Sequence, residues 1–143
     1  MAVPQRLTMV MLGVDDVARS TSFYESLGWR RSSASQDTIT FFSMQGSVLG
    51  LYSRQALAED ARVSADGTGF RAVTMALNCE NAAAVDEVFA DWISAGAVPV
   101  KQPEAVFWGG YSSYVADPDG HLWEIAYNPY SPNDAAGLMQ LPD

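Results

Sequence analysis

The sequence predicts an α+β fold in which one unit, βαβββ in element order, occurs twice along 143 residues. Each half begins with an apolar run, continues with apolar residues at helical spacing, and then alternates apolar and polar residues as strands do. Each expected helix is followed by a glycine, Gly28 in the first half and Gly96 in the second, as is common past helix ends. One such unit cannot bury enough apolar surface alone, so the two are expected to form a single domain.

The first unit is expected over residues 5–53, with strands at residues 7–14, 29–34, 38–44 and 47–52. Either Asp15 or Asp16 can cap its helix, because each carboxylate precedes the apolar helical stripe. Gln45-Gly46 is expected to form the tight turn between the last two strands, since glycine adopts a positive φ without strain.

The second unit is expected over residues 70–128, with strands at residues 72–78, 98–102, 111–116 and 121–128. Asn81 is placed to cap its helix. The apolar stripe of this helix follows the i, i+3, i+4, i+7, i+8 pattern and consists of Val85, Val88, Phe89, Trp92 and Ile93. This is the strongest helical period in the chain.

Residues 54–69 are expected to link the units and to contain one or two helical turns near residues 55–61. Residues 129–143 lack periodicity and are expected to form an irregular tail that carries Tyr130, Leu138, Met139 and Leu141. These apolar side chains suit packing on a partner chain or on the body of the same chain, and the sequence does not choose between the two.

Composition excludes several classes of function. The net charge of −9 and the pI near 4.3 would repel phosphate backbones and anionic membranes, so neither nucleic acid nor membrane is an expected partner. No segment reaches the ~20 apolar residues that span a bilayer, and the apolar run at residues 7–14 ends at Asp15. We therefore expect a cytoplasmic protein.

Cys79 is the only cysteine and His121 the only histidine. One cysteine cannot build a disulfide framework or a cysteine-rich zinc site, and one histidine cannot build a multi-histidine metal site within a chain. His121 follows a tight turn, and no G-x-S-x-G sequence accompanies it, so a serine-histidine-aspartate triad is not expected.

The closing strand places one carboxylate apart from its apolar residues. Asp117-Pro118-Asp119-Gly120 is turn sequence, because proline presets φ and glycine accepts a positive φ. In the strand that follows, Trp123, Ile125 and Tyr127 share one face and Leu122, Glu124 and Ala126 the other. The apolar face belongs against a core, and Glu124 faces either solvent or a site.

Together these features resemble the vicinal oxygen chelate superfamily, which includes glyoxalase I, extradiol dioxygenases, fosfomycin resistance enzymes and bleomycin resistance proteins. The residues that carry the resemblance are the paired units and the sequences Val14-Asp15-Asp16-Val17, Ser22-Phe23-Tyr24, Leu27-Gly28 and Asp117-Pro118-Asp119-Gly120-His121-Leu122-Trp123-Glu124. The resemblance implies a U-shaped mixed sheet with its helices on the convex side and a site on the concave side.

Metal-dependent members of that superfamily hold a divalent ion with ligands on the first and last strand of each unit. The resemblance assigns these places to Met9, Gly50, Thr74 and Glu124. Glu124 alone has a side chain suited to such an ion, because thioether sulfur is soft, glycine has no side chain, and threonine is a poor ligand. No metal and no other cofactor is therefore expected.

What remains is an expected pocket with a mostly apolar and aromatic lining. Its ligand-binding residues are expected to be Met9, Met11, Gly50, Tyr52, Thr74, Ala76, Trp108, Tyr111 and Glu124. Such a lining suits a small organic molecule that is partly aromatic or cationic. The methionines are alternatively core residues, and Trp108 belongs either to a lid or to a loop packed on the body.

Three functional hypotheses follow from the resemblance. The first is a protein of the bleomycin-resistance kind that binds a small organic ligand without a metal. The alternative is a lyase, isomerase or dioxygenase-type enzyme in which Glu124 is the catalytic acid–base group or a metal ligand. The third concerns assembly: members commonly dimerise, so a homodimer is expected, with pairing of the units either within a chain or swapped between chains.

Overall fold

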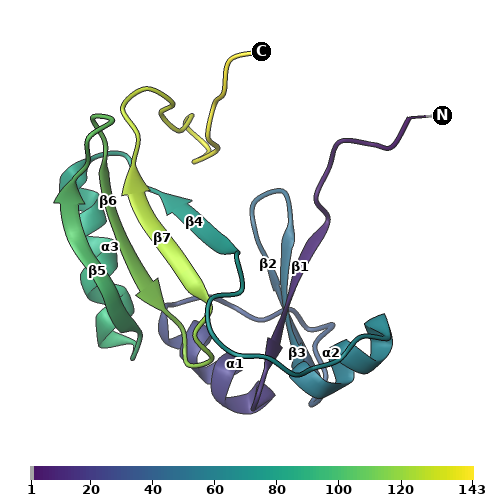
Figure 1. Ribbon diagram of the computed structural model, residues 1–143. Coiled ribbons are helices and arrows are strands. Elements are labelled where there is room, and N and C mark those ends of the chain that lie inside the picture. The colour runs from purple at the N-terminus through teal and green to yellow at the C-terminus, as the bar shows by residue number, and fades with distance from the viewer. Residues whose placement is uncertain (1) are drawn as a thin grey trace. The chain divides into compact units, whose positions relative to one another are not determined.

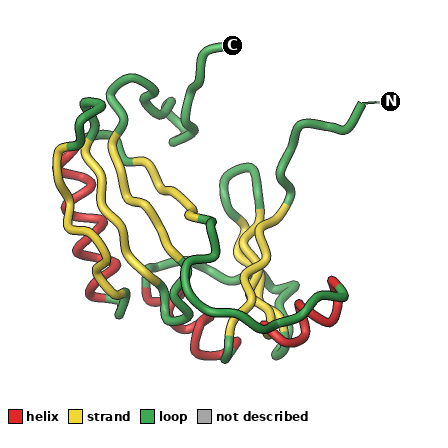
Figure 2. Tube along the Cα trace, in the orientation of Figure 1, coloured by secondary structure: helices red, strands yellow, loops and turns green. Residues whose placement is uncertain are grey.

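The computed structural model describes residues 2–143. The chain divides into two compact units, the first ending at Thr68 and the second beginning at Gly69. Each unit contains one mixed sheet with helices (Figures 1 and 2), so the predicted α+β class is confirmed. No helix among residues 2–143 is both long and apolar enough to span a bilayer.

The first unit contains three strands and two helices. In chain order these are β1 (Met9–Val14), α1 (Val17–Ser26), β2 (Ile39–Ser43), β3 (Val48–Ser53) and α2 (Arg54–Ala61). The sheet order is β1-β3-β2, with β1 parallel and β2 antiparallel to β3. Asp16 caps α1 by accepting a 3.0 Å hydrogen bond from the Arg19 N–H, and Gly46 has the positive φ expected of its turn.

An aromatic and aliphatic core fills the space between α1 and this sheet. Tyr24 of α1 lies with its ring centroid 6.0 Å from that of Phe42 on β2 and stacks on Trp29 at 5.5 Å. Leu49 and Leu51 of β3 are buried with them. A 2.7 Å hydrogen bond between the hydroxyls of Thr21 and Thr40 satisfies the polar groups buried in this core.

The prediction of a strand at residues 29–34 is wrong. Only an isolated bridge between Arg31 and Phe42 forms there. The physical reason lies in a serine side chain. The Phe41 N–H, which an added strand would use, donates instead to Ser35 Oγ at 2.9 Å. Such side-chain acceptors compete with the backbone ladder and favour turns. The first unit therefore has three strands where four were expected.

The second unit has the expected βαβββ order. Its elements are β4 (Thr74–Asn78), α3 (Ala82–Ser94), β5 (Val98–Ala105), β6 (Tyr111–Ala116) and β7 (Leu122–Tyr127). The sheet order is β4-β7-β6-β5, with β4 parallel to β7 and the other pairs antiparallel. The edge strand β5 contains Pro99 and Pro103, and its pairing with β6 shifts register twice.

Helix α3 packs along one face of this sheet, as Figure 1 shows. Asn81 caps the helix by accepting a 2.8 Å hydrogen bond from the Ala84 N–H, as predicted. Trp92 of α3 lies with its ring 5.2 Å from that of Trp123 on β7. Trp123 and Ile125 are buried on this side, so the face of β7 assigned from its alternation is confirmed.

The turn between β6 and β7 fixes the register of these strands. The buried carboxylate of Asp117 accepts hydrogen bonds from the backbone N–H groups of Asp119, at 3.0 Å, and His121, at 2.9 Å. Gly120 has a φ of +85°, which a residue with a Cβ rarely adopts. The Asp117 N–H donates to the His121 carbonyl at 2.9 Å and closes the hairpin.

The linker and the tail both contact their own units. Arg54, at the start of α2, donates to the carbonyls of Ala65 and Gly67, each at 2.8 Å, and α2 confirms the short helix expected near residues 55–61. In the tail, the side-chain amide of Asn133 donates to the Asn78 carbonyl of β4 at 2.9 Å. The tail therefore packs on its own unit at this point.

Candidate functional site

The parallel strand pairs of the two units have the same register. Met9 is paired with Val48 and Met11 with Gly50 in the first unit. Thr74 is paired with Leu122 and Ala76 with Glu124 in the second. Gly50 therefore corresponds to Glu124 and Met11 to Ala76. At this paired position the large side chain of the first unit is Met11, on the first strand. In the second unit the large side chain is Glu124, on the last strand.

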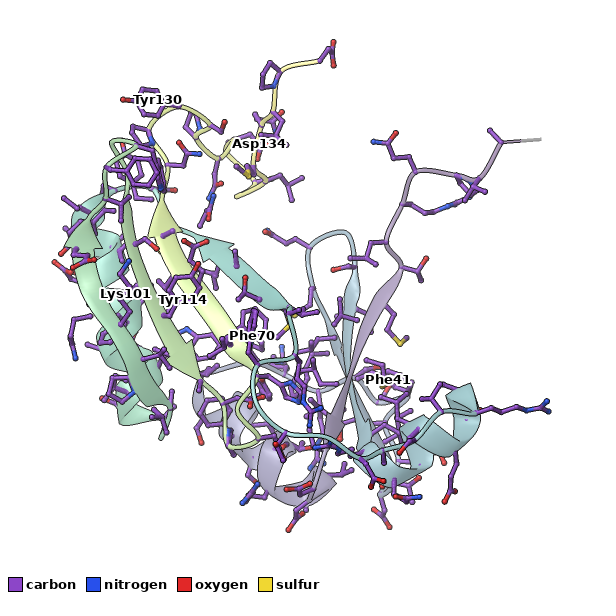
Figure 3. The ribbon with its side chains drawn as sticks, in the orientation of Figure 1. Phe41, Phe70, Lys101, Tyr114, Tyr130 and Asp134 are labelled. Carbon is purple, nitrogen blue, oxygen red and sulfur yellow. The ribbon has the colours of Figure 1, made fainter. Side chains whose placement is uncertain are left out.

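A row of side chains crosses the second sheet on the face opposite α3. The strand registers pair Ala76 with Glu124, Glu124 with Tyr114, and Tyr114 with Lys101. Trp123 points to α3, so its neighbour Glu124 points to the opposite, open face. We call these residues the Glu124 row, and Figure 3 shows Tyr114 and Lys101 of this row on neighbouring strands.

A serine beside the row holds the Glu124 carboxylate. Ser112 Oγ lies 2.6 Å from Glu124 Oε2, and the serine hydroxyl donates to the carboxylate. Ser112 is paired with Ala126, so the bond runs diagonally from β6 to β7. Ser112 is only 2% exposed, and the hydrogen bond to this carboxylate satisfies its buried hydroxyl.

Tyr114 is the register partner of Glu124 on β6. Partial burial of the phenol, followed by the charge of Glu124 and a hydrogen bond to it, raises the pKa of Tyr114, whereas Lys101 acts in the opposite direction. The phenol therefore stays protonated at neutral pH and serves as a hydrogen-bond donor. Lys101 itself pairs with Glu104, with its Nζ 3.2 Å from the carboxylate.

The open face of the first sheet carries the expected methionines. A Cβ added at Gly50 would lie 2.6 Å from the Met11 sulfur and 3.6 Å from the Met9 sulfur, so both thioethers cover this glycine. Strand alternation places Tyr52 on the same face. Phe41, which Figure 3 labels, is the register partner of Gly50 on β2. Met9, Met11, Gly50 and Tyr52 thus share one face, as expected, and this face is opposite α1.

Of the other expected lining residues, Thr74 and Ala76 lie on the face of Glu124, and two lie elsewhere. Tyr111 lies on the face of α3, where its hydroxyl donates to Asp86 at 2.8 Å, so it is on the opposite side of the sheet from Glu124 and not among the lining residues on that face. Trp108 is 38% exposed and its indole packs against Gly110, within its own loop. The convergence of Met9, Thr74 and Glu124 on one hollow stays a prediction from the sequence.

Sequence reasoning missed Ser112, Tyr114 and Lys101. The signal for the first two was present, because the turn at residues 117–120 fixes how β6 and β7 pair. Counting back from that turn places Tyr114 opposite Glu124 and Ser112 two residues further along the same face. Lys101 could not be placed this way, since β5 shifts register on either side of it.

The side chains at the positions assigned to metal ligands do not fit a divalent ion. Met9 has a soft sulfur, Gly50 has no side chain and is covered by Met11, and Glu124 alone of the four has a carboxylate, which is too few hard ligands for such an ion. Within residues 2–143, no group of three or more histidine, cysteine or acidic side chains is arranged to hold a metal.

The chain belongs to the Glyoxalase/Bleomycin resistance protein/Dioxygenase superfamily, whose family model matches residues 6–125. This confirms the resemblance read from the sequence. A comparison with curated proteins found no match.

Several solved structures are similar to this chain in fold. A glyoxalase-related enzyme from Fulvimarina pelagi is 33% identical, with a TM-score of 0.86 over 98% of this chain and 100% of the other. A protein from Agrobacterium tumefaciens solved by NMR is 31% identical, with a TM-score of 0.70 over 89% and 98% of the two chains. A lactoylglutathione lyase from the same organism is 22% identical, with a TM-score of 0.67 over 90% and 97%, and shares the fold.

Proposed function

We propose that this protein binds a small organic molecule on the open face of its second sheet, and that it does so without a metal ion. The observation that carries the proposal is the 2.6 Å hydrogen bond between Ser112 and Glu124. The carboxylate at the position where the resemblance implies a metal ligand is instead held by a hydroxyl of the protein. A carboxylate oriented by fixed donors is suited to hydrogen bonding with an organic ligand.

The surroundings of Glu124 support this proposal. Tyr114 contributes an aromatic ring with a protonated hydroxyl, and Ala76 and Leu122 contribute apolar surface on the same face. Few polar groups placed on an otherwise apolar surface are typical of sites for small organic ligands. Such a surface orients a ligand through the carboxylate and contacts its body through the ring and the aliphatic groups.

The test is a ligand screen on protein treated with a chelator. A panel of aromatic amphiphiles is added to ¹⁵N-labelled protein in EDTA, and amide shifts and calorimetric heats are recorded. We expect saturable binding that shifts Ala76, Ser112 and Glu124 and leaves Val85 and Phe89 of α3 unchanged. The proposal is wrong if no amphiphile binds, or if binding appears only when one equivalent of a divalent metal is restored.

A second candidate is an enzyme that uses Glu124 as an acid–base group. The 33% identity to a glyoxalase-related enzyme over nearly the whole chain favours it. Tyr114 supports it, because a protonated phenol beside a carboxylate supplies a proton donor next to a proton acceptor. The test is turnover of the methylglyoxal–glutathione adduct in EDTA by the wild type and by E124Q. Turnover that E124Q abolishes supports this candidate, and no turnover by the wild type excludes a metal-free glyoxalase activity.

A further inference from the structure

Two uncharged groups of the protein border the Glu124 carboxylate. The Ser112 hydroxyl donates to it at 2.6 Å, and Tyr114 is its register partner on β6. Neither group has a positive charge that would compete with a cationic ligand. The cation of the row, Lys101, pairs with Glu104 on its own strand at 3.2 Å.

One side of the carboxylate is bordered by a small side chain. The register partner of Glu124 on β4 is Ala76, whose methyl group cannot reach across a carboxylate. Tyr114 occupies the opposite side, on β6. A ligand can therefore approach Glu124 from above β4, and Thr74 lies on the same face two residues before Ala76.

The charge of the whole chain favours a cation at this place. The net charge of −9 gives the protein a negative field, which attracts cations and repels anions. A charge-assisted hydrogen bond to a carboxylate is about twice as strong as one between neutral groups. Glu124 is half-buried, and solvent screens the attraction between a half-buried carboxylate and a cation less than it screens an exposed pair. The ring of Tyr114 adds a surface on which a cation or an aromatic body can pack.

We propose that Glu124 binds the protonated nitrogen of an organic cation, an ammonium or amidinium group attached to an aromatic or apolar body. This inference rests on the proposed function and narrows the class of its ligand. Ser112 and Tyr114 orient the carboxylate, and Ala76 leaves room for the cation.

The test uses three probes of the same shape and different charge: benzamidine, benzamide and benzoate. Each is titrated by NMR and calorimetry, in EDTA, into the wild type, E124Q and the matched control E87Q, which removes an exposed carboxylate from α3, on the other face of the sheet. We expect benzamidine alone to bind at the Glu124 row, E124Q to weaken it about tenfold or more, and E87Q to leave it almost unchanged. Benzamidine affinity for the wild type should also fall as salt is added.

The result can separate this inference from the proposed function. If benzamide binds as well as benzamidine, or if folded E124Q keeps the affinity of the wild type, the cationic class is wrong while ligand binding itself stands. The same holds if neutral amphiphiles bind and benzamidine does not. If neither the three probes nor the amphiphile panel binds, both proposals fail. If E124Q does not fold, the wild type decides the matter, because the inference requires benzamidine, and not benzamide, to shift the signals of Ala76, Ser112 and Glu124.

Discussion

The Ser112 hydroxyl donates to the Glu124 carboxylate at 2.6 Å, diagonally across the β6–β7 pair. The neighbouring Ser113 points to the α3 side and donates to the Ile125 carbonyl at 2.8 Å, so two adjacent serines have separate roles. Ser112 orients the Glu124 carboxylate on the open face, and Ser113 hydrogen-bonds a backbone carbonyl within the core.

These serines form a matched pair of variants. S112A and S113A are each expected to lower the free energy of unfolding by about 1 kcal/mol, because each removes the hydrogen bond of one buried serine. S112A alone should also weaken ligands at the Glu124 row. Urea unfolding and probe titration measure the two effects. Equal loss of ligand affinity in S112A and S113A would show that Ser112 has no special part in orienting the carboxylate.

Tyr114 is expected to make the stability of the protein depend on pH at high pH. Burial and the negative charge of Glu124 raise its pKa above the usual 10.0 in the folded protein. The folded state then holds this proton more tightly than the unfolded state, so its contribution to stability is complete below about pH 10 and is lost as pH rises through the folded pKa. Phenolate absorbance at 295 nm should show a late-titrating tyrosine that Y114F removes. An unchanged titration curve in Y114F would contradict this assignment.

Met11 and Gly50 are expected to be energetically coupled. In G50A the new Cβ meets the Met11 sulfur, which lies at the end of a flexible side chain, so the methionine must move at a cost of about 1 kcal/mol. In the M11A background the same substitution should cost less. A double-mutant cycle by urea unfolding gives the coupling energy. A coupling of zero would mean that Met11 does not cover Gly50 in solution.

Asp117 is expected to matter more for stability than an exposed acid of the same unit. D117A leaves the backbone N–H groups of Asp119 and His121 without their carboxylate acceptor and should cost about 1.5–3 kcal/mol. The control D91A removes an exposed carboxylate from α3 and should change stability by less than about 0.5 kcal/mol. Thermal and urea unfolding compare them, and similar losses in both variants would contradict the role of the turn.

Periodicity and turn chemistry were sufficient to predict most of the fold. Helix α3 follows from five apolar residues at helical spacing, and the register of β6 and β7 follows from the Asp117 turn. The strand at residues 29–34 was mispredicted because its partner N–H, on Phe41, is taken by the Ser35 side chain, and no periodicity signals that competition.

The candidate site was predictable where it depended on strand alternation. The faces of Met11 and Glu124 follow from the two-residue period of their strands. The face of Tyr111 is set by its pairing with Tyr127 on the α3 side, which takes Tyr111 away from the face on which it was expected. Lys101 depends on bulges in β5, whose positions are set by tertiary pairing and leave no pattern in the sequence.

The irregular pairing of β5 has a consequence for self-association. Pro99 and Pro103 lack the N–H that a neighbouring strand would need, and the two shifts in register interrupt the flat ladder that a fibril extends. The outer margin of the second sheet is thus a poor template for another chain. We expect concentrated solutions to resist cross-β growth from this side of the sheet.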